Sequence, residues 1–188
     1  MKNNSLKMWI VSALFAAFIA IFAQLTLPLP LVPITGQTFA VGLAVTILGM
    51  RYGTLSIIIY ILLGAIGVPV FSLMTGGIGI ILGPTGGYII GFLPSAYIMG
   101  FLLERYGFTK KNAFIINLIG MLITLLFGTI WLKYGSHLTW SAAITAGILP
   151  FLIVGVIKAF ASGLAGIVVR NRLVNAKLLP AVTKKISA

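Results

Sequence analysis

The sequence lacks cysteine and has a single acidic residue and a single histidine among its 188 residues. Without cysteine there are no disulfides, no thiolate metal sites and no cysteine nucleophile. The acidic residue is Glu104 and the histidine is His137, whereas general acid–base catalysis and hard-metal binding usually need several such groups that converge. The sequence therefore predicts neither an enzyme nor a metal-binding protein.

Charged residues of either sign are scarce, at 7% of the chain, while 60% of the residues are hydrophobic. A soluble domain is about a quarter charged, and so few polar groups cannot cover a surface in water. In lipid the backbone must form helices or a closed barrel, and the long continuous apolar segments favour helices. We expect an all-α, multi-pass membrane protein, with residues 1–188 forming one transmembrane domain.

Six apolar segments are candidates for membrane spans: 8–27, 39–50, 54–66, 88–103, 114–132 and 143–169. The second and third are shorter than the usual ~20 residues, so tilting, local thinning of the bilayer or burial in protein must help them. The turn Arg51-Tyr52-Gly53 separates these two segments. After the first segment, three prolines between positions 28 and 33 forbid further helix.

The basic residues test this count and set the orientation. They give a net charge of +12, but they lie singly or in pairs between apolar segments, as in membrane proteins rather than nucleic-acid-binding proteins. With six crossings and a cytoplasmic amino terminus, the outer side carries Lys133, Lys158 lies within the last span, and the cytoplasmic side carries Lys2, Lys7, Arg51, Arg105, Lys110, Lys111, Arg170, Arg172, Lys177, Lys184 and Lys185. Five crossings would destroy this asymmetry, so both termini are predicted to be cytoplasmic.

The amino-terminal segment also has features of a signal peptide, because Lys2 and Lys7 precede an apolar run. The run is longer than a typical signal core and leads into the prolines without a clear small-residue cleavage site. Cleavage would also leave an odd number of spans. A retained first helix is therefore favoured over a cleaved signal.

Lys158 is the most informative single residue, because it lies inside an otherwise apolar segment. A lysine at bilayer depth costs a few kcal/mol and needs a partner or a wet cavity. Arg170 at the cytoplasmic interface is ~18 Å away along a helix, too far for the lysine to reach that surface. Glu104 ends its own span on the cytoplasmic side, so no buried carboxylate is available. A neutral lysine, a carbonyl-lined cavity and an anionic ligand remain, and the ligand is favoured.

Two uncharged segments are further candidates for ligand contact. The segment 76–88 is rich in glycine, which allows close backbone approach. It has no lysine or arginine, so it suits a neutral hydrogen-bonding group better than a phosphate, and a tight turn without a ligand is the alternative. The polar segment 32–38 could line an extracytoplasmic entrance, form a lid or cap the next helix. The candidate ligand-binding residues are Thr35, Gln37, Gly83, Thr85, Gly86, Gly87, Tyr88 and Lys158.

The first apolar segment carries alanines with four-residue spacing: Ala13, Ala16, Ala17, Ala20 and Ala23. Small residues at this spacing give a smooth helix face that allows close packing in lipid. The pattern fits packing within the protein and packing against a partner equally well.

Three of these segments resemble the signature segments of the BioY family: Val-Pro-Ile-Thr-Gly-Gln-Thr at 32–38, Gly-Ala-Ile-Gly-Val-Pro-Val-Phe at 64–71 and Gly-Pro-Thr-Gly-Gly-Tyr at 83–88. BioY is the biotin-specific S component of energy-coupling factor (ECF) transporters, and the resemblance covers nearly the whole chain. It implies a six-helix S-component-type bundle in the plasma membrane, in which residues 1–188 form a single transmembrane substrate-binding domain. That domain is expected to capture biotin with high affinity on the extracytoplasmic side. The resemblance also implies two kinds of partner, a transmembrane coupling (T) protein and a pair of cytoplasmic ABC-type ATPases.

The resemblance also assigns roles to particular residues. An Ala-x-x-x-Ala face on the first helix docks S components onto the coupling protein, and Ala13, Ala16, Ala17 and Ala20 fit that pattern. One departure is Val156, where an Asp that contacts the ligand's ring is expected before Lys158.

Two other functions stay open on the sequence alone. One is an S component for another small vitamin, although the segment 83–88 favours biotin. The other is a solitary membrane facilitator, which the alanine face argues against. The chain has no ATP-binding motif, so it is not expected to energise uptake by itself, and no nucleic acid is expected among its partners.

Overall fold

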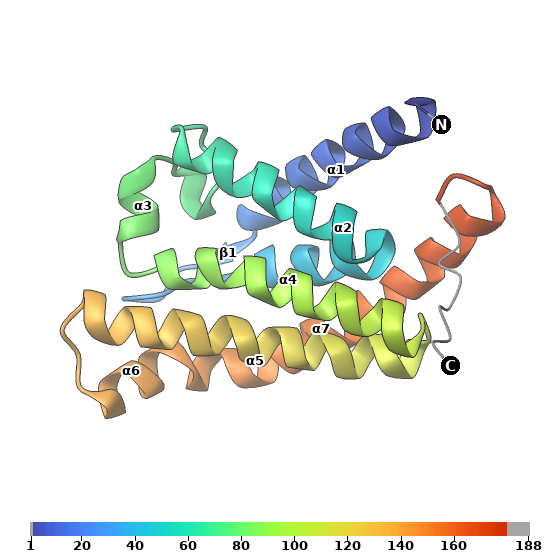
Figure 1. The fold of residues 1–188 in the computed structure, drawn as a ribbon. Helices are drawn as coiled ribbons and strands as arrows, with labels where there is room; N and C mark the ends of the chain where they lie inside the picture. The colour runs from blue at the N-terminus through green and yellow to red at the C-terminus, as the bar shows by residue number, and fades with distance from the viewer. Residues whose placement is uncertain (1, 180–188) are drawn as a thin grey trace.

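Long helices run side by side along one direction in the computed structural model, which describes residues 2–179 and the side chains of residues 5–179 (Figure 1). The long helices are α1 (Lys2–Ala23), α2 (Gln37–Ala65), α4 (Gly86–Tyr106), α5 (Lys110–Gly135) and α7 (Leu149–Asn175). The shorter elements are β1 (Thr26–Leu27), β2 (Ile34–Thr35), the 3₁₀ turn η1 (Ser72–Met74), α3 (Ile78–Leu82) and α6 (Trp140–Gly147). The expected all-α membrane bundle is confirmed.

Helix α2 is two arms joined by a sharp reversal at Gly49. Gly49 has φ +79°, a backbone conformation that favours glycine. A methyl group on Gly53 would lie 2.8 Å from the Cα of Val45, although eight residues of straight helix would separate them by ~12 Å. The prediction that the turn lies at residues 51–53 is therefore wrong, since these residues are helical and the chain reverses at Gly49. Five helical stretches are long and apolar enough to span a membrane, and the fold-back of α2 gives the described chain six crossings.

The last predicted span, residues 143–169, is divided into two helices. Ile148 leaves the helical conformation with φ −120° and ψ −55°, and α7 begins at the next residue. Pro150 lies in the first turn of α7, where its missing N–H costs no hydrogen bond. Helix α7 alone makes the crossing, and α6 lies at the end of the bundle away from the amino terminus (Figure 1).

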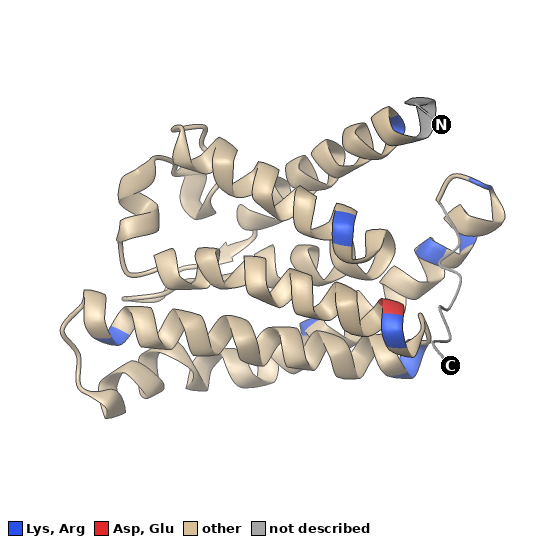
Figure 2. Cartoon of the chain, viewed as in Figure 1, with Lys and Arg blue, Asp and Glu red and all other residues tan. Residues whose placement is uncertain are grey.

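Basic residues gather at the end of the bundle where α1 begins and α7 ends (Figure 2). The positive-inside rule assigns this end, here called the inner end, to the cytoplasm. The opposite, outer end holds the β1–β2 pair, α3 and α6. The predicted cytoplasmic Lys184 and Lys185, and the carboxyl terminus itself, lie outside the described residues.

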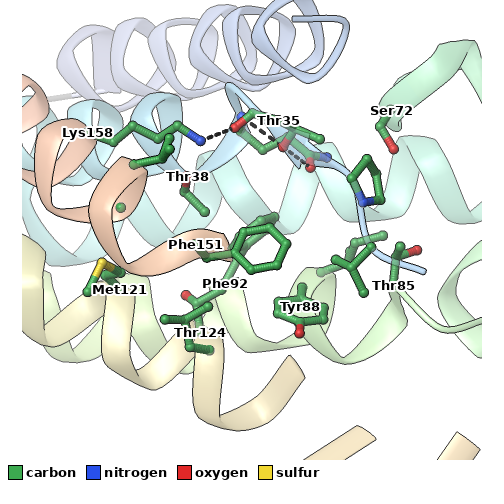
Figure 3. A pocket seen from close by; sticks show the side chains of 17 residues that line it. Thr35, Thr38, Ser72, Thr85, Tyr88, Phe92, Met121, Thr124, Phe151 and Lys158 are labelled. Carbon is green, nitrogen blue, oxygen red and sulfur yellow. Dashed lines mark hydrogen bonds between the residues drawn. The ribbon is translucent and has the colours of Figure 1, made fainter. Parts of the chain in front are cut away.

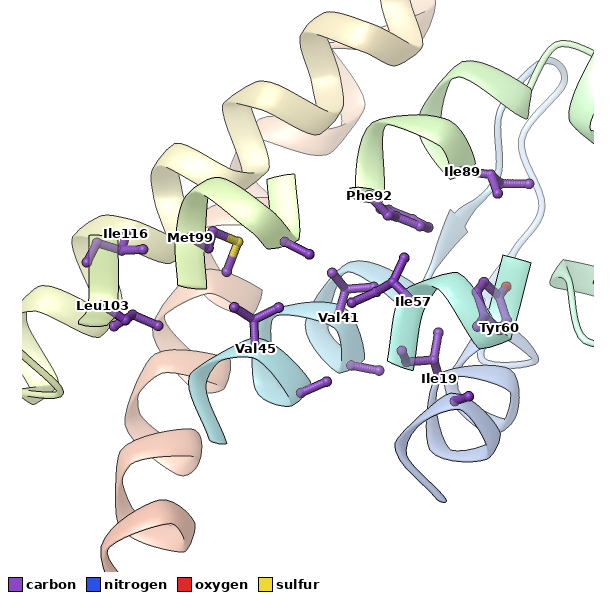
Figure 4. Close-up of a cluster of buried hydrophobic side chains, with 14 of the residues drawn as sticks. Ile19, Val41, Val45, Ile57, Tyr60, Ile89, Phe92, Met99, Leu103 and Ile116 are labelled. Carbon is purple, nitrogen blue, oxygen red and sulfur yellow. The ribbon is translucent and has the colours of Figure 1, made fainter. Parts of the chain in front are cut away.

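The short first arm of α2 is stable in a membrane because protein surrounds it. Every residue from 40 to 49 is buried, in a core shared with α1, α4, α5 and α7 (Figure 4). Asn117 of α5 donates to the hydroxyl of Thr46 at 3.0 Å and accepts a hydrogen bond from Ser162 of α7 at 2.9 Å. This network joins three helices in the bundle, as expected for polar residues in lipid.

The inner end is closed by the only carboxylate side chain and a buried arginine. Glu104 Oε1 accepts a hydrogen bond of 2.8 Å from the backbone N–H of Met50, the first residue after the reversal in α2. Arg170 donates to the backbone carbonyl of Ile47, and its guanidinium lies 3.6 Å from the ring centroid of Phe108. These contacts fix the reversal of α2 to α4 and α7.

Candidate ligand-binding site

A cavity lies near the outer end, between the segment around β2, η1, the first turns of α4, the middle of α5 and the start of α7 (Figure 3). Its volume of about 60 Å³ is several times the ~10–15 Å³ that holds one water, so it is more than a packing defect. The walls are mainly apolar, and they carry a small set of polar side chains: Thr35, Gln37, Thr38, Ser72, Thr85, Tyr88, Thr124 and Lys158.

Lys158 provides the one charged side chain among the described residues that line this cavity. Its Nζ donates a hydrogen bond of 2.6 Å to the backbone carbonyl of Thr35 (Figure 3). An ammonium has three donors, so this bond leaves two. Glu104 lies at the inner end against Met50, which confirms that the chain's acidic side chain is not the partner of Lys158. The site combines a cation with apolar walls and suits an amphiphilic anion.

The carbonyl of Thr35 is held in place by its own segment. β1 and β2 pair antiparallel, with Thr26 opposite Thr35, and the N–H of Gly36 donates to the carbonyl of Leu25 at 2.9 Å. A side chain on Gly36 would come within 2.5 Å of the carbonyl oxygen of Phe22 at the end of α1. Only glycine allows the segment to lie this close to α1.

Thr35 and Gln37 line the cavity, and their side chains are hydrogen-bonded to each other. The Thr35 hydroxyl donates to Gln37 Oε1 at 2.8 Å, and Gln37 Nε2 donates to the hydroxyl of Tyr60. The hydroxyl of Thr35 also accepts from the N–H of Gln37 at 3.3 Å. The segment therefore lines the cavity, and the Thr35 hydroxyl accepts a hydrogen bond from the first N–H of α2.

The glycine-rich segment contributes Thr85 and Tyr88 to the cavity, whereas Gly83, Gly86 and Gly87 lie outside its lining. The carbonyl of Gly83 accepts a hydrogen bond of 3.0 Å from the indole of Trp131. A Cβ on Gly86 would overlap the carbonyl of Ile81, and a Cβ on Gly87 would overlap the Cβ of Trp131. These glycines allow close packing that places Thr85 and Tyr88, and their contact with a ligand stays a prediction.

Val156 does not face the cavity. It is 42% exposed, whereas Val154, Gly155 and Lys158 line the cavity from the same helix. Residues 154 and 158 are one helical turn apart and share a face, and residue 156 points roughly the opposite way. The absence of Asp at position 156 therefore removes no group from the lining.

Sequence reasoning missed the side chains that three helices bring together: Phe92 of α4, Met121 and Thr124 of α5, and Phe151 of α7. In the sequence each is an ordinary residue of an apolar helix, and nothing nearby along the chain indicates that it lines a binding site. Thr38, which also lines the cavity, could have been included because it lies one residue beyond Gln37 in the polar segment 32–38.

The four alanines proposed for docking divide between two faces of α1. Ala13 and Ala17 are exposed, beside the exposed Ile10 and Leu14. Ala16 is only 1% exposed and belongs to the core, and Ala20 is half-buried against that core. Successive helical residues are separated by about 100°, so positions 13 and 17 share a face that position 16 does not. A partner can therefore contact Ala13 and Ala17 directly, but not Ala16.

A helical bundle of six crossings, with a cavity near its outer end that holds one cationic side chain among apolar walls, defines a small-molecule-binding membrane protein. The family model described as "BioY family" matches residues 1–175. Biotin transporter BioY2 of Lactococcus lactis subsp. cremoris is 42% identical over 159 residues, covering 85% of this chain and 87% of that protein. Biotin transporter BioY of Thermotoga maritima is 38% identical over 159 residues, covering 82% and 90%.

The crystal structure of the S-component for biotin from an ECF-type ABC transporter is similar over 91% of this chain and 94% of that chain. The TM-score is 0.84 and the sequences are 30% identical. The chain belongs to the BioY family, a family of multi-pass plasma-membrane transporter components rather than enzymes. The resemblance found in the sequence is confirmed.

Proposed function

We propose that this protein is the high-affinity biotin-binding S component of an ECF-type vitamin uptake transporter, and that it captures biotin from the extracytoplasmic side. The observation that carries the proposal is the position of Lys158, whose ammonium faces an apolar cavity near the end of the bundle opposite the basic residues. Its relatives include proteins named as biotin transporters, and the S component for biotin shares its fold.

The chemistry of biotin matches the two kinds of wall in the cavity. The carboxylate pairs with the two remaining donors of Lys158, and the fused ring and aliphatic chain pack against Phe92, Met121 and Phe151. Thr38 and Thr124 also line the cavity, and their hydroxyls are proposed to bind the neutral ureido group. Burial of the carboxylate beside a cation favours binding because the apolar surroundings exclude competing water.

Binding of biotin and of biotin methyl ester to the purified single chain tests this function. Wild-type protein binds biotin, and Lys158→Met weakens that binding by about 30-fold or more, as expected when one partner of a buried charge pair is removed. The ester has no negative charge and loses little affinity. Lys111→Met, which changes an exposed lysine at the inner end, is the matched control and leaves both affinities unchanged.

Two results would count against these assignments. Equal loss of affinity for biotin and its ester in Lys158→Met would show that Lys158 does not bind the carboxylate. Absence of biotin binding by folded wild-type protein would reject biotin as the ligand, and a panel of other small vitamins would follow.

Transport is proposed to need a coupling (T) protein and two ABC-type ATPases, because the chain has no ATP-binding motif of its own. The exposed face of α1 around Ala13 and Ala17 is the proposed docking surface, since small residues allow close helix packing. Ala17→Trp is expected to disrupt assembly with the coupling protein while biotin binding is retained. Leu122→Trp places the same bulk on an exposed position of α5 and is expected to leave assembly intact. Intact assembly in Ala17→Trp would show that this face of α1 does not contact the coupling protein.

A further inference from the structure

An apolar groove runs along the outer surface of the last turns of α5, separate from the ligand cavity. Five residues line it: Phe127, Ile130, Trp131, Tyr134 and Gly135. From residue 127 to residue 135 the helix rises by ~12 Å, which matches a substantial part of a lipid acyl chain. Tyr134 is 64% exposed, so the groove faces outward from the bundle, toward lipid.

The groove has a preformed back wall. Gly87 and Gly91 of α4 lie against Trp131 and Phe127, and a Cβ on Gly91 would come within 2.9 Å of the Cβ of Phe127. The indole N–H of Trp131 is fixed by its hydrogen bond to the carbonyl of Gly83. Because the lining side chains are held from behind, an acyl chain meets a shaped surface and less ordering is required on binding.

A cation, Lys133, lies against the ring of Tyr134, one of the residues that line this groove. The Nζ of Lys133 lies 4.3 Å from the ring centroid of Tyr134 and 5.0 Å from that of Trp140. The chain's one acidic side chain, Glu104, binds Met50 at the inner end, so it does not neutralise this lysine. Tyr and Trp prefer the level of the lipid headgroups, which places Lys133 at the depth of the phosphates.

From this charge complementarity we propose that the groove is a binding site for an anionic phospholipid of the outer leaflet. The headgroup phosphate pairs with Lys133, and one acyl chain lies along Phe127, Ile130 and Tyr134. The aromatic rings beside Lys133 hold its ammonium near the mouth of the groove by cation–π contact. This site does not depend on the identity of the ligand in the cavity around Lys158.

Quenching of Trp131 by brominated lipids tests the site. The chain has three tryptophans, and replacing Trp9 and Trp140 by Phe leaves Trp131 as the only reporter in protein reconstituted into nanodiscs. Phe at position 140 keeps an aromatic ring for the cation–π contact with Lys133. Chain-brominated phosphatidylglycerol and chain-brominated phosphatidylcholine are compared at the same low mole fraction in unbrominated phosphatidylcholine. One lysine near a membrane surface predicts roughly fivefold preferential occupancy by the anionic lipid.

Variants that change the charge test whether Lys133 causes the preference for the anionic lipid. Lys133→Gln is expected to abolish it and Lys133→Arg to retain it, while Lys110→Gln, at an exposed position of the inner end, leaves it unchanged. Thermal unfolding in detergent verifies that each variant is folded. Equal quenching by the two lipids in protein with Lys133 intact would overturn the proposal and indicate non-selective surrounding lipid. A preference that survives Lys133→Gln would overturn it as well.

Discussion

The inner and outer ends of the bundle use their few polar side chains in opposite ways. At the inner end, Glu104 and Arg170 both bind backbone groups, and together they hold the reversal of α2. At the outer end, Lys158 binds one backbone carbonyl and otherwise faces a cavity. Thr38 and Thr124 line the same cavity.

This difference shows which end is built for stability and which for binding. Buried polar groups that have found protein partners stabilise a fold, because leaving them unpaired is costly. Polar groups that keep donors or acceptors free in an apolar cavity are available to a ligand. We therefore expect substitutions at the inner end to lower stability without changing biotin affinity, and substitutions at the outer end to do the reverse.

The largest expected effect on stability comes from Arg170→Met. This change leaves the buried carbonyl of Ile47 without its charged donor and lowers the free energy of unfolding by about 1.5–3 kcal/mol. Unfolding of the purified protein in detergent, followed by tryptophan fluorescence, measures the loss. Biotin affinity of the remaining folded protein should be unchanged, since Arg170 lies three helical turns from Lys158.

Arg172→Met is the matched control, because Arg172 lies on the same helix and is exposed. It should change neither stability nor affinity. Loss of biotin affinity in Arg170→Met without loss of stability would contradict this difference between the two ends, because it would show that the inner end affects the ligand site.

A smaller effect is expected from alanine at two glycines, one at each end. Gly49→Ala places a side chain at φ +79°, which costs about 1–2 kcal/mol. The added methyl would also lie 2.6 Å from Glu104 Oε1. Gly79→Ala, in α3 at the outer end, meets no atom within 4 Å and should be neutral or slightly stabilising. Thermal unfolding of the two variants compares them directly, and equal losses would contradict the special role of the reversal.

The membrane spans and their orientation were predictable, and Lys158 could be singled out, because each depends on the order of residues along the chain. Hydropathy gives the spans, and the basic residues between them give the cytoplasmic side. An unpaired lysine in an apolar helix indicates a site without knowledge of its neighbours. The walls of that site were not predictable, because Phe92, Met121 and Phe151 meet only when three distant helices pack together.

Glycine shows where local sequence reasoning was least specific. Gly86 and Gly87 were predicted to contact the ligand, but they allow α3, α4 and α5 to pack closely. Gly49 drew no prediction, although it forms the reversal of α2. A glycine can serve a positive φ angle, a close helix contact or a ligand, and its identity alone does not distinguish these uses. The same limit applies to Ala16 and Ala17, which have similar neighbours in sequence but lie on different faces of α1.

The smallest expected effect is on the outer end, from Trp131→Phe. This change keeps an aromatic ring in place but removes the hydrogen bond to the carbonyl of Gly83, two residues before Thr85 in the cavity wall. One lost hydrogen bond that orders this segment should weaken biotin binding roughly two- to tenfold.

Trp140→Phe, at an exposed position outside the cavity lining, is the control. Because the segment from Gly83 to Thr85 lies outside the inner-end network, stability should change less than affinity does. Calorimetry with biotin measures the affinity, and thermal unfolding of the same samples measures the stability. A loss of stability with unchanged affinity would mean that the glycine-rich segment supports the fold rather than the ligand site.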